Sequence, residues 1–369
     1  TTKKCFKESS TASLRKMKNL PNKDLQKYKP HIDGLRAIAI LLVVLFHAWP
    51  DHLKGGFIGV DVFFVISGFL ISSLLFRELQ NGGIDFKDFY ARRIRRIFPS
   101  LLTVLVFCLL LGWLSFFSIE LKLLGKHVIA GAGFISNILL WREVSYWDGA
   151  AQEKPLLHLW SLGIEEQFYI FWPLTLALIW KLRRGRFALI VFGLIFSFAL
   201  NVFLIKTKPS AVYYLPITRI WELLLGTILA YQELIDPKAG QKFRSEYVSW
   251  VGITLILVSA IIISRENAFP GWHALIPTFG AMLVLFNGNS SFLNRRILGH
   301  PWLVFIGLIS YPFYLWHWPL LSFAQIISGG NVSIGFRGLL IVLAFILSFF
   351  TYRYIERLRH VSGATPFLI

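Results

Sequence analysis

The stretch DGLRAIAILLVVLFH (residues 33–47) decides the fold class, because an apolar run lies between two ionisable residues. Arg36 marks one end of the run and His47 the other, eleven residues later. Ionisable groups in hydrocarbon cost several kcal/mol, so they usually face a protein interior or an aqueous cavity. His47 is therefore a candidate functional residue in a segment that crosses a membrane.

Similar apolar runs, separated by basic loops, continue through the 369 residues, of which 55% are hydrophobic and 16% charged. The mean hydropathy is +0.60, whereas a soluble domain of this size carries more charge and shorter apolar blocks. The predicted fold is an all-α integral membrane bundle of about ten transmembrane helices. The expected spans are residues 35–50, 56–78, 98–118, 159–180, 187–205, 212–232, 247–264, 270–287, 301–324 and 335–354.

One further apolar segment, residues 122–141, contains Lys126, His127 and Asn137, and we expect it to be re-entrant or interfacial. If it does not cross, twelve of the later basic residues share the side of the N-terminal tail and four lie opposite, as the positive-inside rule requires. We therefore expect both termini in the cytoplasm. The twelve are Lys181, Arg183, Arg184, Arg186, Lys238, Lys242, Arg244, Arg295, Arg296, Arg353, Arg357 and Arg359, and the four are Lys206, Lys208, Arg265 and Arg337.

The net charge of +18 follows from this topology, since basic loops face an anionic lipid leaflet. We do not take this charge as a sign of nucleic-acid binding, because we expect no basic soluble domain. Cys5 in the tail and Cys108 in the third span cannot plausibly pair, and neither a disulfide framework nor a metal site is expected. We divide the chain into a flexible basic cytoplasmic tail (1–30), a membrane domain (31–357) and a C-terminal tail (358–369).

Four arginines in five residues, Arg92, Arg93, Arg95 and Arg96, precede the third span. Arginines three or four apart share a helical face, and their guanidinium groups suit bidentate phosphate binding. The simpler alternative is that they only orient the span. Phosphate binding accounts better for so dense a run.

Arg36 and His47 are eleven residues apart, which is close to three helical turns and roughly 16 Å along the axis. Both side chains therefore point the same way. A ligand with an anionic head at the cytoplasmic face and a long arm would match this layout, and coenzyme A has that shape. The alternative for His47 is a buried histidine that a neighbouring group satisfies.

Four further ionisable residues, Asp61, Glu165, Glu166 and His317, are candidates to orient His47. A partner that fixes the tautomer of an imidazole and stabilises its protonated form makes it a general base. The alternatives are a solvated helix start for the two glutamates and packing in an aromatic belt for His317. Ser67-Gly68 predicts close helix packing, or Ser67 carries an acyl group.

Several strings, in order, resemble the acyltransferase-3 family of integral membrane O-acyltransferases. They are Ile32 to Ala37 followed by His47, Gly59 to Phe64, Ser67 to Leu70, Phe89 to Pro99, Leu157 to Tyr169, Tyr311 to Pro319 and Tyr352 to Glu356. The resemblance implies a ten-helix domain that moves an acyl group, usually acetyl, from a cytoplasmic coenzyme A thioester to a hydroxyl of a cell-surface carbohydrate. It also implies that His47 is catalytic and that Arg92 with Arg95, or Arg93 with Arg96, contacts the donor.

The chain departs from the family pattern in two respects. Many relatives that modify surface glycans add a helix and an SGNH hydrolase-like domain, whereas this sequence stops soon after Glu356. We expect either a stand-alone member or a fragment. The final motif also continues as Arg357-Leu358-Arg359 instead of a basic residue and a proline.

We therefore predict a bacterial inner-membrane O-acetyltransferase, surrounded by membrane lipids, with acetyl-coenzyme A as co-substrate and no metal. The expected acceptor is a carbohydrate or lipid-linked glycan such as lipopolysaccharide O-antigen. Direct transfer and an acyl-enzyme remain equally compatible with the residues. The alternatives are a transporter or channel for an anionic solute with His47 as proton relay, or a structural subunit of a polysaccharide assembly machine.

Overall fold

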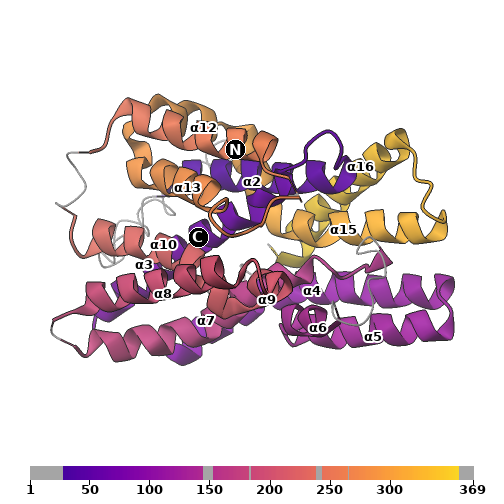
Figure 1. The fold of residues 1–369 in the computed structure, drawn as a ribbon, viewed down its shortest axis with the longest axis horizontal. Helices are drawn as coiled ribbons and strands as arrows, with labels where there is room; N and C mark the ends of the chain where they lie inside the picture. Colours follow the sequence, from indigo (N-terminus) through magenta and orange to yellow (C-terminus); the bar gives the residue numbers. More distant parts are fainter. Residues whose placement is uncertain (1–27, 144–152, 183, 238–242, 265, 357–369) are drawn as a thin grey trace, which may run out of the picture. The chain divides into compact units, whose positions relative to one another are not determined.

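The computed structural model describes residues 28–143, 153–182, 184–237, 243–264 and 266–356. All regular elements in these ranges are helical, which confirms the all-α class (Figure 1). The α-helices are α2 (Pro30–Ala48), α3 (Gly59–Gln80), α4 (Phe86–Ser115), α5 (Ser118–Ala132), α6 (Ser136–Glu143), α7 (Leu159–Trp180), α8 (Arg186–Leu204), α9 (Pro209–Tyr214), α10 (Ile220–Leu234), α12 (Glu246–Ile262), α13 (Leu275–Asn287), α14 (Pro301–Leu308), α15 (Ser310–Ile327) and α16 (Ile334–Phe350). The 3₁₀ helices are η1 (Gly56–Ile58), η3 (Pro216–Thr218) and η4 (Gly288–Ser290), and the π-helices are η5 (Leu293–Leu298) and η6 (Thr351–Glu356).

Five helical segments in the described residues are long and apolar enough to cross a membrane: Pro30–Ala48, Gly56–Gln80, Phe86–Ser115, Arg186–Leu204 and Ile334–Glu356. The bent pair α14 and α15 makes a sixth if it counts as one span. The predicted number of ten is therefore not confirmed and stays a prediction. The remaining expected spans are helical but mostly shorter, since α10, α12 and α13 have 15, 17 and 13 residues.

Two expected segments contain a break. Residues 122–141 form α5 and α6, which are separated by a turn in which Phe134 takes a positive φ of 55°. This break agrees with the prediction that the segment is not one continuous span. The expected span 301–324 is instead two helices, α14 and α15, that meet at 64°. The predicted tails lie outside the described residues, except for residues 28–30.

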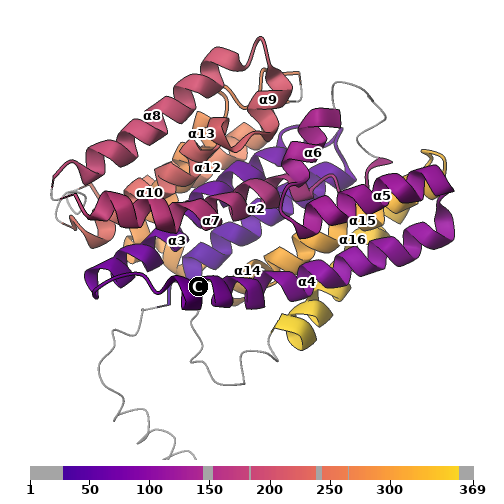
Figure 2. The ribbon, with the colours of Figure 1, turned by 90° about the horizontal axis from the view of Figure 1, so that it is seen from below.

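Two buried apolar clusters hold the helices together. The first draws mainly on α3, α10, α12 and α13, and the second on α4, α15 and α16, while α2 and α7 contribute to both. Figure 1 shows the pairs α12 with α13 and α15 with α16, and Figure 2 shows α4 beside α5. Helix α2, which carries Arg36 and His47, therefore borders both halves of the bundle.

The arginine run lies inside the first turns of α4. The Asp85 carboxylate caps this helix by accepting a hydrogen bond from the backbone N–H of Asp88 at 3.0 Å. Asparagine, aspartate and serine are favoured at this position because they satisfy an otherwise unpaired backbone donor. The cap fixes where α4 begins and so which arginines face the bundle.

Candidate functional site

His47 and His317 meet although 270 residues separate them. Nδ1 of His47 lies 2.9 Å from Nε2 of His317, and the two rings stack with centroids 5.2 Å apart. His47 ends α2, whereas His317 is fully buried in the middle of α15. Of the candidates proposed to orient His47, the structure therefore brings His317 into hydrogen-bonding contact.

The neighbours of His317 determine the direction of this hydrogen bond. Its Nδ1 lies 2.7 Å from the carbonyl oxygen of Tyr314 and 3.1 Å from that of Phe313. Carbonyl oxygens only accept, so Nδ1 of His317 carries a proton and Nε2 of the neutral ring accepts from Nδ1 of His47. The lone pair of neutral His47 then lies on Nε2, where a general base needs it.

An open hollow adjoins His47. Its polar lining includes Gln325 and Arg337. The ring of Trp318 packs edge-on against His47 with centroids 4.6 Å apart. The guanidinium of Arg337 donates to the carbonyl oxygen of Ala48 at 3.2 Å and so holds the end of α2 beside the hollow.

The other end of α2 carries a buried charge pair. Nη1 of Arg36 lies 3.4 Å from the Asp33 carboxylate one turn earlier, and both side chains are nearly buried. Arg36 and His47 lie on the same continuous helix, so the helical rise puts them roughly 16 Å apart along its axis. One helix thus carries a cation at one end and the histidine pair at the other.

The four arginines of α4 have different surroundings. Arg92 pairs with Glu78 at 2.7 Å and also with Asp88, and Arg95 is exposed. Arg93 instead stacks on the ring of Tyr169, 4.6 Å from its centroid. Arg96 interacts electrostatically with Arg93 and with Arg36. The inward register is therefore Arg93 with Arg96.

Glu165 lies beside this arginine group and not in a hydrogen bond with the histidine pair. Its Oε1 accepts hydrogen bonds from the hydroxyls of Ser67 and Tyr169. Glu166 is buried and interacts with the same arginines. Both glutamates thus lie next to Arg93.

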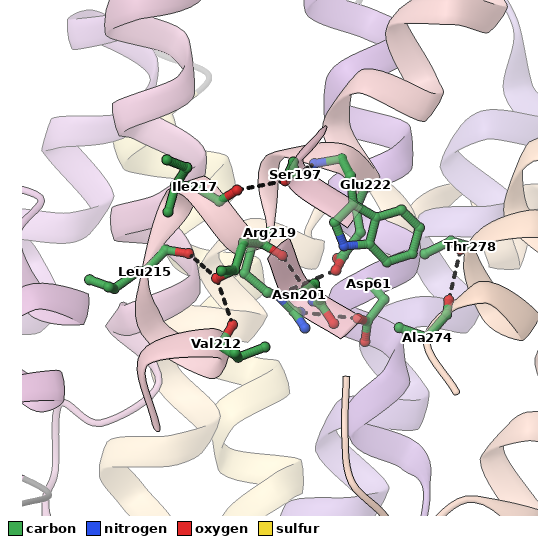
Figure 3. A network of polar contacts seen from close by, with 12 residues as sticks. Asp61, Ser197, Asn201, Val212, Leu215, Ile217, Arg219, Glu222, Ala274 and Thr278 are labelled. Atoms are coloured by element: carbon green, nitrogen blue, oxygen red, sulfur yellow. Dashed lines mark hydrogen bonds and ion pairs between the residues drawn. The ribbon is translucent and has the colours of Figure 1, made fainter. Parts of the chain in front are cut away.

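Asp61 belongs to a separate, fully buried cluster (Figure 3). Its Oδ1 pairs with Nη2 of Arg219 at 3.0 Å, and Nε of Arg219 lies 3.4 Å from Glu222. Aromatic rings surround the guanidinium, with Phe64 at 5.5 Å and Trp160 at 5.7 Å. Asp61 therefore holds α3 against the start of α10.

The sequence reasoning missed Arg219 and Tyr169. Arg219 lies inside the expected span 212–232, so the rule that singled out His47 would have found it as well. Tyr169 has no such signal, because a tyrosine in a membrane helix is common and only tertiary contact shows its role. Among the described residues, no group of three or more His, Cys, Asp or Glu side chains could hold a metal ion.

Comparisons with known proteins show the family to which the chain belongs. The model of a family described as an acyltransferase domain matches residues 30–353. Peptidoglycan O-acetyltransferase OatA of Listeria monocytogenes is 32% identical over 347 residues, which cover 90% of this chain and 56% of that protein. A Bacillus subtilis protein provisionally named as a peptidoglycan O-acetyltransferase, YrhL, is 33% identical over 360 residues, covering 92% and 56%.

A Staphylococcus aureus protein (strain MSSA476) provisionally named as an O-acetyltransferase is 34% identical over 360 residues, covering 93% of this chain and 59% of that protein. The chain thus spans somewhat more than half the length of these relatives. No solved structure matches it. Since the family match covers almost all of the described residues, the chain belongs to the acyltransferase-3 family of integral membrane proteins.

Proposed function

We propose that this protein is a membrane O-acetyltransferase that moves an acetyl group from acetyl-coenzyme A to a hydroxyl of a cell-surface glycan. The observation that carries the proposal is the contact of His47 with His317 beside an open hollow. This pair has the form of an oriented general base. Arg36 lies at the other end of α2, and the inward arginines of α4 lie near it.

The donor fits the arginine group. Arg96 lies close enough to Arg36 and to Arg93 for the like charges to repel, and phosphate oxygens are the natural partners of such guanidinium groups. An arm of roughly 16 Å would carry the thioester from this cluster toward His47. With basic loops facing the cytoplasm, donor phosphates bind at that face and the hollow opens outward.

In the direct mechanism, Nε2 of His47 removes the proton of the acceptor hydroxyl. The hydroxyl oxygen attacks the thioester carbonyl carbon, the C–S bond breaks, and the proton passes to the leaving thiolate. His317 accepts the hydrogen bond from Nδ1 of His47 throughout and stabilises the positive charge that develops. His47 is thus the catalytic residue and His317 its positioning residue.

The name of the Listeria relative favours peptidoglycan over the lipopolysaccharide O-antigen expected from the sequence. We therefore propose a bacterial cytoplasmic-membrane enzyme that acts on a carbohydrate or lipid-linked glycan outside the cytoplasm, with peptidoglycan as the first acceptor to test.

The test uses protein reconstituted in proteoliposomes with radiolabelled acetyl-coenzyme A on one side and peptidoglycan fragments or lipopolysaccharide on the other. Wild type should label one acceptor, and His47→Ala should lower the rate by about 10²–10⁴, the usual contribution of a general base. A folded His47→Ala protein with full activity would contradict the assignment. Solute flux without acetyl transfer would favour the transporter alternative.

A further inference from the structure

A second hollow lies on the outside of the bundle, between α7 and α8. It is a groove of about 390 Å³, within the size range of ligand-binding pockets. Residues of α7 and α8 line it, and η3 and the first turns of α10 complete the lining. The groove exists because α8 packs mainly on α10 and only lightly on α7 (Figure 1). Its lining includes none of the residues proposed above for donor binding or catalysis.

The lining of the groove suits a hydrocarbon chain better than a polar ligand. Its polar side chains, Gln167, Trp172 and Thr175, all donate hydrogen bonds within the protein. The rest of the lining is apolar, and Phe171 is 63% exposed. Apolar space of this kind does not hold water. In a membrane the occupant is therefore a hydrocarbon chain, which restores the dispersion contacts that a void would lose.

The groove is about as long as one lipid leaflet is thick. Along α7 it extends from Gln167 to Ile179, which is roughly 18 Å at 1.5 Å per residue. The hydrocarbon core of a bilayer is about 30 Å thick, so each leaflet contributes about 15 Å. One extended acyl chain therefore matches the length of the groove.

Basic residues lie at one end of the groove. Ile179 and Leu189 line that end, and the short connection between them carries Lys181, Arg184 and Arg186. Lys181 and Arg184 are exposed, and no carboxylate of the described residues forms an ion pair with any of these three cations. Their charges therefore remain for an anionic group at the membrane surface.

Trp180 indicates that this end lies at the level of lipid head groups. The guanidinium of Arg186 stacks on its ring, 4.2 Å from the centroid. Tryptophan is enriched at the membrane–water interface, and basic pockets at that level bind the phosphates of anionic lipids. The simpler alternative is that the cations only orient α7 and α8 in the membrane. That role requires no groove beside them.

We propose that the groove binds one anionic glycerophospholipid. One acyl chain lies between α7 and α8, and the phosphate contacts Lys181, Arg184 and Arg186. Helix α7 also carries Tyr169, on which Arg93 stacks, so the lipid supports the helix that positions the arginine group. The site is separate from acetyl transfer, and its test requires no enzymatic activity.

The test is native mass spectrometry of the detergent-solubilised protein with phosphatidylglycerol or with phosphatidylcholine of the same acyl chains. Phosphatidylglycerol should form a complex with one lipid at a lower concentration than the zwitterionic lipid does. The combined variant Lys181→Gln, Arg184→Gln, Arg186→Gln should weaken binding of phosphatidylglycerol about fivefold per cation removed, and should leave phosphatidylcholine nearly unchanged. Equal binding of the two lipids by wild type would overturn the proposal.

The matched control removes three cations elsewhere in the chain. Arg244, Arg295 and Arg296 are also exposed, and they lie outside the connection between α7 and α8. Replacing all three with glutamine should keep the wild-type preference for phosphatidylglycerol. An equal loss in both triple variants would show that net charge alone attracts the lipid, and the proposal would be wrong.

A second variant tests the position of the acyl chain. A Cβ on Gly193 would lie 3.4 Å from Cδ1 of Leu224, which also lines the groove, so a leucine at position 193 extends into it. Gly193→Leu should weaken binding of both lipids about fourfold for each methylene group that it displaces. Ala199→Leu is the control, because Ala199 is exposed on the same helix outside the lining, and it should bind as wild type does.

Thr175→Phe fills the groove from α7 and takes the place of Gly193→Leu if that variant does not fold. Folding is checked by gel filtration and thermal unfolding. If the folded variant that fills the groove binds phosphatidylglycerol as tightly as wild type, the acyl chain does not lie between α7 and α8, and the proposal fails.

Discussion

At the scale of single residues, Arg219 shows how much a buried charge depends on its partners. It is fully buried with Asp61 and Glu222, which are themselves buried carboxylates. Burying a charge is unfavourable unless a partner compensates it, and removing one partner leaves the others uncompensated. Asp61 is thus held in a structural ion pair with Arg219. From the sequence alone it was a candidate partner of His47.

Arg219→Met should lower the free energy of unfolding by about 3–5 kcal/mol, because it leaves two buried carboxylates without a cationic partner. Thermal unfolding of the detergent-solubilised protein measures the effect. The double variant with Asp61→Asn should recover part of the loss. Arg184→Met, at an exposed position, is the control and should stay within about 0.5 kcal/mol of wild type. Equal effects of the two methionine variants would contradict the role of the buried pair.

His317→Ala should lower kcat by about 10- to 100-fold with little change in KM for acetyl-coenzyme A. The variant loses one hydrogen bond to a group that becomes charged, worth about 1.5–3 kcal/mol. His317→Gln retains an acceptor oxygen and should recover part of the rate. A purely structural role predicts instead that both variants lower stability and leave kcat per folded molecule unchanged.

At the scale of elements, glycines set the distance between α3 and α10. A Cβ on Gly68 would lie 1.9 Å from the carbonyl oxygen of Leu223, and one on Gly226 would lie 2.1 Å from that of Val65. Only glycine permits such an approach. Gly68 therefore lets the two helices pack closely, which is the simpler of the two interpretations of Ser67-Gly68. Ser67 contacts Glu165.

Gly68→Ala should destabilise the protein by about 1–3 kcal/mol, as overpacking of a tight contact does. Thermal unfolding in detergent measures it. Gly125→Ala on α5 is the matched control, because its Cβ meets no atom within 4 Å and alanine favours a helix by about 1 kcal/mol. A loss of stability in the control as large as in Gly68→Ala would argue against the close contact as the cause.

The surroundings of the four arginines of α4 also indicate which of them would contact the proposed donor. Arg93 and Arg96 lie within the interior electrostatic cluster, while Arg92 is paired with acidic residues near the surface and Arg95 is exposed. Arg93→Ala with Arg96→Ala should therefore abolish binding of coenzyme A in calorimetric titrations. Arg92→Ala with Arg95→Ala should retain most of it. The reverse order of effects would show that the other register binds the donor.

At the scale of the whole molecule, the proposed donor site and the proposed general base lie at opposite ends of α2. His47→Ala should therefore still bind coenzyme A while losing transfer. At about 100 times Kd, the ligand should stabilise both wild type and His47→Ala by about 2.7 kcal/mol in thermal-shift measurements. If the variant lost this stabilisation, the two functions would not be separable along the helix.

The sequence by itself determined the helical membrane class, the Arg36 to His47 spacing and the family. These features depend on composition, helical period and short motifs, which are local properties of the chain. The tertiary structure decided that His317 pairs with His47, that Asp61 pairs with Arg219 and that Glu165 joins Ser67 beside Arg93. Each of these contacts joins residues 98 to 270 positions apart. Local pattern cannot specify such partners, because they depend on how separate helices pack, and packing is set by the shapes of all the faces together.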